Sequence, residues 1–106
     1  MIVALTKAAK RDISDAAAWY EQQREGLGAE FIDSVDEGIG KIALNPLGYA
    51  VVSGENRRCV VDRFPYALWF KVRDNVVVVG CLHHRRAPHL SKERGLGVIE
   101  FRKPNP

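Results

Sequence analysis

The stretch that most constrains the fold of this chain runs from Arg57 to Pro88. It holds three short runs rich in valine and aromatic residues, separated by breaks of a few residues. Short runs of this kind, bounded by turn-forming residues, are typical of β-strands. We place the two turns at Phe64-Pro65 and Asp74-Asn75, because proline, aspartate and asparagine all favour turn conformations. The stretch therefore predicts an antiparallel meander of three strands.

The two turns also predict the register of the meander. The predicted cross-strand pairs are Cys59–Phe70, Val61–Leu68, Phe70–Val79, Leu68–Cys81 and Val72–Val77. Every member of these pairs is apolar, so we expect them to form the face that packs on the core. The opposite face is mixed, with Trp69 lying across from Gly80. In this register the two cysteines are two strands apart, about 9–10 Å, which predicts free thiols and no disulfide.

The residues before the meander predict a short edge strand followed by two amphipathic helices. Ile2–Leu5 is the strand, Thr6 is a suitable N-cap, Gly26-Leu27-Gly28 breaks the helices apart, and Asn45-Pro46 ends the second one. The apolar stripe of the first helix is Ile13, Ala16, Ala17 and Tyr20, and that of the second is Phe31, Ile32, Val35, Ile39, Ile42 and Ala43. The expected fold class is α+β, with a two-helix hairpin packed on one face of a small antiparallel sheet in the order β-α-α-β-β-β.

Length and charge limit the domain organisation and the partners. A chain of 106 residues forms one domain, which we place at residues 1–94, with a partly ordered tail at 95–106. No apolar run reaches the about 20 residues that span a bilayer, and the N-terminus does not resemble a signal peptide, so we expect a cytoplasmic protein. Residues 1–56 carry 5 Lys+Arg and 9 Asp+Glu, a net charge of −4, whereas residues 57–106 carry 11 and 4, a net charge of +7. A basic sheet predicts an acidic or phosphate-bearing partner.

Candidate catalytic residues lie at the end of the last strand and on the mixed face. His84 offers an imidazole for proton transfer, and Arg86 and Lys71 offer positive charge for a developing anion. The alternative is an ordinary solvated strand end. His83 and His84 are adjacent and point to opposite faces, so no metal site is predicted, and no cofactor motif is present.

The mixed face also predicts a docking surface. Trp69 is flanked by Val60, Val78 and Leu82, and the patch is edged by Arg58, Lys71, Arg73 and Arg86. Aromatic and aliphatic side chains with a basic rim are typical of protein interfaces and of base-stacking platforms. The alternative is that residues 96–101 fold back over the patch.

Several short motifs, in this order and spacing, resemble the RelE/ParE superfamily of toxins from type II toxin–antitoxin systems, to which the plasmid stabilisation family belongs. The resemblance covers about residues 1–94. The motifs are Ala9…Asp12-Ile13, Tyr20-Glu21-Gln22, Gly26-Leu27-Gly28…Phe31, Asn45-Pro46, Arg63-Phe64-Pro65-Tyr66 and Leu82-His83…Arg86-Ala87-Pro88…Arg94. The family fold is two helices on a small antiparallel sheet, which agrees with the pattern above.

The resemblance implies a toxin that arrests growth and is held inactive by a cognate antitoxin in a hetero-oligomer. RelE-like members cut mRNA on the ribosome, often with a late tyrosine, whereas ParE-like members inhibit DNA gyrase and are not nucleases. The last tyrosine here is Tyr66, which favours the ParE-like function. Three hypotheses stand: a toxin that blocks a protein target such as gyrase, a ribosome-dependent endoribonuclease, and a non-toxic basic RNA-binding module. For the first, we expect an acidic, helix-containing antitoxin on the Trp69 face.

Overall fold

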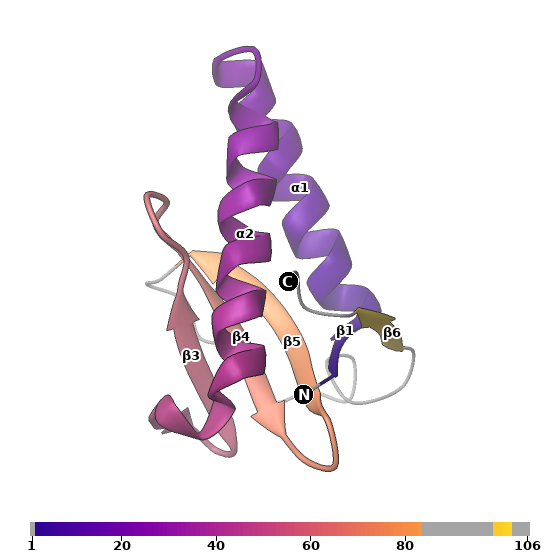
Figure 1. The fold of residues 1–106 in the computed structure, drawn as a ribbon. Helices are drawn as coiled ribbons and strands as arrows, with labels where there is room; N and C mark the ends of the chain where they lie inside the picture. The colour runs from indigo at the N-terminus through magenta and orange to yellow at the C-terminus, as the bar shows by residue number, and fades with distance from the viewer. Residues whose placement is uncertain (1, 84–98, 103–106) are drawn as a thin grey trace.

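The structure is a helical hairpin packed on one face of a six-stranded sheet (Figure 1). The computed structural model describes residues 2–83 and the backbone of residues 99–102. The helices are α1 (Lys7–Gln23) and α2 (Leu27–Leu44), with a 3-10 turn, η1, at Pro46–Gly48. The strands are β1 (Val3–Thr6), β2 (Val51–Ser53), β3 (Asn56–Val60), β4 (Tyr66–Val72), β5 (Val76–His83) and β6 (Ile99–Arg102), in the spatial order β2-β3-β4-β5-β1-β6. The predicted α+β fold is confirmed, and β2 and β6 are added to the predicted order.

The ends of both helices follow from the local sequence. Thr6 is the N-cap of α1, and its hydroxyl oxygen accepts a hydrogen bond from the Ala9 N–H at 3.1 Å. Gly26 has a φ of 87°, a left-handed conformation that glycine adopts without steric cost, and this allows the tight reversal into α2. The Glu21 carboxylate then accepts from the N–H groups of Gly26 and Gly28, both at 3.0 Å, so α1 supplies the cap of α2. The predicted N-cap and helix break are both confirmed.

The main core lies between the helices and the sheet. The apolar stripes predicted for the helices face it, with Phe31, Val35 and Ile39 each at most 2 % exposed. From the sheet, Leu68 and Phe70 are fully buried against them. Tyr20, Phe31, Phe64 and Tyr66 pack together in this core, and the edge-to-face pairs among them have ring centroids 4.9–6.1 Å apart.

The first strand is not at the edge of the sheet, so that prediction was wrong. β1 pairs in parallel with β5, from Val3↔Val76 to Leu5↔Val78, and antiparallel with β6 on its other side. Because β1 has neighbours on both sides, its side chains are buried, as expected of an apolar run that does not alternate. Among the described strands, the edges of the sheet are β6, which lies beside β1, and β2 at the opposite end.

The first hairpin of the meander has a different register from the predicted one. Cys59 lies opposite Leu68, where Phe70 was predicted, and the Val61 N–H donates to the Tyr66 carbonyl at 2.8 Å. The loop is therefore centred one residue earlier than Phe64-Pro65. Arg63 in this loop has a φ of 71°, which is uncommon for a residue other than glycine. The predicted pairs of Cys59 with Phe70 and of Val61 with Leu68 were wrong.

The second hairpin contains a β-bulge that the sequence pattern did not predict. Val72 lies opposite Val76 and Phe70 opposite Val78, but Trp69 lies opposite Gly80, so β5 has one extra residue between the last two pairs. The predicted pairs of Phe70 with Val79 and of Val72 with Val77 were wrong for this reason. The predicted pairs Leu68–Cys81 and Trp69–Gly80 are correct, because the bulge restores the register that a two-residue turn would have set.

Candidate functional site

The face of the sheet opposite the helices holds the residues predicted to bind a partner. Trp69, predicted to lie exposed there, is only 2 % exposed, and Leu82 is also buried. Val60 is 60 % exposed, as predicted for a surface residue. The expectation of an exposed Trp69 platform was therefore wrong, and the exposed part of this face is centred on β3.

Trp69 packs among apolar neighbours on this face. It belongs to a second apolar cluster that lies apart from the main core, formed by Ala4, Ala67, Trp69, Val77, Val79 and Leu82. The bulge turns Val77 and Val79 to this face, although the sequence pattern placed both on the helix side. β1 adds Ala4 beside them. The sheet thus has apolar side chains on both faces.

Basic side chains remain at the rim of this second cluster. The Arg58 guanidinium lies over the Trp69 ring, 5.8 Å from its centroid, which is cation–π distance. Lys71 is half-buried on the same strand as Trp69, and Arg73 forms an exposed ion pair with Glu55 at 2.7 Å. The predicted basic rim of Arg58, Lys71 and Arg73 therefore lies on β3 and β4 and the loop that follows.

The predicted catalytic residues can be placed only in part. His84 and Arg86 lie outside the described residues. Lys71 lies opposite Val77, near the start of β5. His84 follows His83, the last residue of β5, in the sequence. Six residues of strand separate these two points, about 20 Å at the usual strand rise. Lys71 is therefore distant from the strand end where the other two candidates follow.

The two thiols are structural rather than nucleophilic. Cys59 and Cys81 are both free and buried, as predicted. Burial raises the pKa of Cys81 to about 12, with a smaller contribution from the Asp12 carboxylate, and burial also raises the pKa of Cys59. Since the thiolate is the reactive form, neither cysteine is an activated nucleophile near neutral pH.

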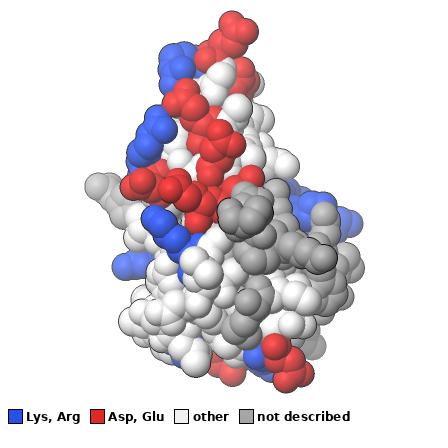
Figure 2. Space-filling view, viewed as in Figure 1, with Lys and Arg blue, Asp and Glu red and all other residues white. Residues whose placement is uncertain are grey.

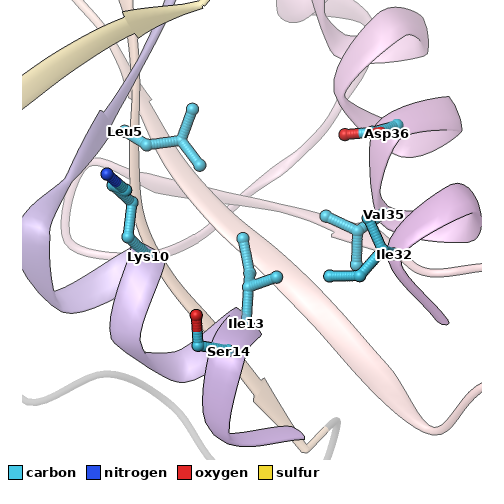
Figure 3. Close-up of a pocket in the computed structure, with 7 residues that line it drawn as sticks. All are labelled: Leu5, Lys10, Ile13, Ser14, Ile32, Val35 and Asp36. Atoms are coloured by element: carbon cyan, nitrogen blue, oxygen red, sulfur yellow. The ribbon is translucent and has the colours of Figure 1, made fainter. Parts of the chain in front are cut away.

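A small groove opens between the two helices on the side near β1. Its volume is about 180 Å³, and it is lined by Leu5, Lys10, Ile13, Ser14, Ile32, Val35 and Asp36. Figure 3 shows Lys10 and Asp36 on opposite sides of an apolar floor. The volume is below the about 300–1,000 Å³ of typical small-molecule sites, so the groove has room for a single side chain of a partner.

The outer surface of the helical hairpin is acidic. Figure 2 shows Asp and Glu side chains gathered along the helices in this view. Glu30 on α2 pairs with Arg63 at 2.8 Å and with Arg24 at 2.7 Å, and these hydrogen bonds lower the pKa of the Glu30 carboxyl. The charge division predicted from the sequence thus places acidic helices and a basic sheet rim on separate surfaces of the molecule.

Asp12 and Trp19 were not identified as site residues from the sequence. Asp12 on α1 accepts a hydrogen bond from the Cys81 N–H of β5 at 3.1 Å, a contact between residues 69 positions apart that has no local signal. Trp19 is 55 % exposed on α1. It lies off the apolar stripe of that helix, and this position could have identified it as a surface residue.

These observations define a small α+β protein whose candidate sites are surfaces for partners. Among the described residues no group of His, Cys, Asp and Glu side chains could hold a metal ion, and neither helix is long and apolar enough to cross a membrane. A family model described as the ParE toxin of the type II toxin–antitoxin system, parDE, matches residues 3–88. The chain therefore belongs to this toxin family, as the sequence motifs predicted, and membership implies an antitoxin partner. No curated protein matches the chain.

Proposed function

We propose that the chain is a toxin that arrests growth by blocking a protein target such as DNA gyrase in the cytoplasm, and that an acidic, helix-containing antitoxin neutralises it. The observation that carries this proposal is the match of the ParE toxin family to residues 3–88, which include both helices and the sheet as far as β5. The match supports a ParE-like function over a RelE-like one. The cellular target is the part of the function that we propose.

The position of Lys71 in the sheet bears on the same choice. A nuclease needs a proton-transfer group and positive charge around one phosphate. Lys71 lies about 20 Å along the sheet from His83 at the end of β5, so the one histidine among the described residues is far from it. A function that needs no such cluster fits this arrangement better.

For the antitoxin, we propose the rim around Val60 as the contact surface. Val60 offers exposed apolar area, and Arg58, two residues away on β3, adds positive charge that complements an acidic helix, with Lys71 further along β4 and Arg73 after its end. Trp69 and Leu82 belong to the buried cluster beside this surface. The Trp69 ring holds the Arg58 guanidinium in place over its face. The surface thus combines a small apolar contact with charged groups held by the sheet.

The target is tested with purified toxin released from its antitoxin complex. We expect inhibition of gyrase supercoiling that added antitoxin reverses, and no cleavage of reporter mRNA on ribosomes. Ribosome-dependent cleavage that is lost in the His84→Ala/Arg86→Ala double variant would assign the endoribonuclease function instead. A chain that fails to arrest growth when expressed alone, and that binds RNA, would favour the non-toxic RNA-binding module.

The antitoxin surface is tested separately by affinity measurements. The Arg58→Glu and Val60→Asp substitutions should each weaken antitoxin binding at least about tenfold, equivalent to about 1.4 kcal/mol. Leu44→Asp is a matched control, because Leu44 is an exposed apolar residue at the end of α2, and the helices cover the opposite face of the sheet. Unchanged affinity in both rim variants would show that the antitoxin docks elsewhere. That result would leave the proposed cellular target unaffected.

A further inference from the structure

One corner of the molecule is formed by a run without charged residues. Residues 42–54 contain no Asp, Glu, Lys or Arg, which makes this the longest uncharged run in the sequence. The run includes the end of α2, η1 and β2. Figure 2 shows mostly uncharged surface at the lower left, around the end of α2 in Figure 1. This corner therefore differs from both the acidic surface of the hairpin and the basic rim of the sheet.

The apolar side chains of this corner are exposed. Seven large apolar side chains are exposed in the described part of the chain, and four of them belong to the corner. These four are Leu44 (87 % exposed), Leu47 (67 %), Val51 (53 %) and Val52 (50 %). They follow one another closely through a helix end, a turn and a strand. Single exposed apolar residues are ordinary, whereas a group of them on one surface marks an interaction site.

The corner also contains an edge of the sheet. β2 is the first strand in the spatial order, and among the described strands it pairs only with β3. Edge strands are commonly protected from further association by charged side chains or proline. The sequence of β2 is Val-Val-Ser, which has neither. Because β2 has only three residues and its register with β3 is irregular, we expect a partner to contact mainly the side chains of this corner.

The charge of the corner favours a second copy of the chain as its partner. A nucleic acid is bound through cationic side chains, and residues 42–54 have none. The acidic antitoxin proposed above finds complementary charge at the basic rim and not at this corner. The residues that flank the run, Lys41 and Glu55, have opposite charges, so two copies that meet here have no net charge repulsion. An uncharged apolar surface is thus complementary to itself.

We propose that two copies of the chain associate through this corner in a dimer with two-fold symmetry. In such a dimer the same patch serves both subunits, so the apolar side chains of one copy pack on those of the other. Four partly exposed side chains cover less than the about 800 Å² per partner of a standard interface, so the dimer is weak, with a dissociation constant of about 10–100 µM. This association does not depend on which cellular target the toxin has.

The proposal is tested by sedimentation velocity of the purified full chain between about 1 and 500 µM. We expect a reversible change from monomer to dimer and no larger species, because a two-fold contact closes after two copies. Dilution followed by NMR should shift the backbone amides of residues 44–53 and leave those of α1 unchanged. A monomer at every concentration, growth beyond the dimer, or dilution shifts confined to other surfaces would overturn the proposal.

Variants separate this corner from other apolar surface. Leu47→Asp and Val52→Asp should each weaken the dimer at least about tenfold, because each places two like charges in a symmetric contact. Trp19→Asp, at an exposed apolar residue of α1, is the matched control and should leave the dimer unchanged. Circular dichroism checks that all three variants fold. An equal loss in the control, or no loss in the two corner variants, would contradict the proposal.

Affinity for the antitoxin distinguishes the other occupant of this corner. Leu47→Asp and Val52→Asp should bind the antitoxin as tightly as the wild-type chain does. If both variants lose antitoxin affinity while the wild-type chain stays monomeric, the corner is a part of the antitoxin surface and the proposed dimer is wrong. That result would leave the proposed cellular target unaffected.

Discussion

At the scale of single residues, Asp12 shows how a side chain can replace a missing strand. Its carboxylate accepts from the Cys81 N–H at the part of β5 that β1 does not reach. A buried backbone N–H without a partner is costly, so this position requires an acceptor once the chain turns into α1. Asp12 was not identified as such from the sequence, because periodicity marks it only as a polar residue on the outer side of a helix.

Replacing Asp12 by alanine should lower the free energy of unfolding by about 1–3 kcal/mol, the usual cost of leaving a buried donor unsatisfied. Asp12→Asn keeps an acceptor oxygen and should recover part of the loss. Asp15→Ala, an exposed neighbour on the same helix, is the control and should change stability by less than about 0.5 kcal/mol. Urea unfolding of the three variants measures these differences, and equal effects for Asp12→Ala and Asp15→Ala would contradict the role given to Asp12.

Glu30 predicts how stability depends on pH. Arg63, and next Arg24, lower the pKa of its carboxyl in the folded state through hydrogen bonds to the charged form. A carboxyl with a lower pKa in the folded than in the unfolded state stabilises the fold above its unfolded pKa of about 4.5, and this stabilisation is lost as the pH falls through the folded-state pKa.

Glu30→Gln should therefore lower Tm at pH 7, and the difference from wild type should shrink as the pH falls below about 4.5. Because these ion pairs are exposed, the difference should be small and should decrease in high salt. Glu37→Gln, two turns further along α2, is a control for the general loss of an acidic charge. A Tm difference that grows toward acid pH would contradict this assignment.

At the scale of secondary-structure elements, the helices were predictable and the sheet register was not. Thr6, Gly26 and Asn45-Pro46 mark the helix ends directly, and the 3.6-residue period identifies the buried stripes. The run Val76–Val79 has no alternation to distinguish one face from the other, so a shift of one residue leaves the pattern unchanged. The bulge before Gly80 uses that freedom, and the position of Val77 and Val79 in one cluster with Trp69 could not be predicted.

The bulge can be tested with Phe70, which is fully buried in the main core. Phe70→Ala should cost about 3–5 kcal/mol, as a large core truncation does. The milder Phe70→Leu should couple with Val78→Ala by at least about 0.5 kcal/mol, because these residues are opposite each other on one face, and residues in contact are not additive. The matched cycle with Val79→Ala should be additive, since Val79 lies in the other cluster. Stronger coupling to Val79 would restore the register predicted from the sequence.

At the scale of the whole molecule, the sheet joins the beginning of the chain to its later parts. β1 lies between β5 and β6, so residues near position 3 pair with residues near positions 76 and 102. The sequence predicted the two helices, the strands β1, β3, β4 and β5, and the charge division between helices and sheet. It could not predict this interior position, because a short apolar run at a chain end is equally consistent with an edge strand.

The position of β1 between β5 and β6 predicts that removal of residues 2–5 destabilises the whole fold, although the segment is short. Val3, Ala4 and Leu5 are at most 4 % exposed, and their loss would remove side chains from both apolar clusters and leave β5 unpaired along one side. We therefore expect the shortened chain to lose the cooperative urea unfolding transition followed by circular dichroism. Ile2→Ala, a change at a residue 47 % exposed, should leave stability within about 0.5 kcal/mol of wild type. A shortened chain that keeps a cooperative transition with an unchanged m-value would show that the helices and β2 to β5 fold without β1.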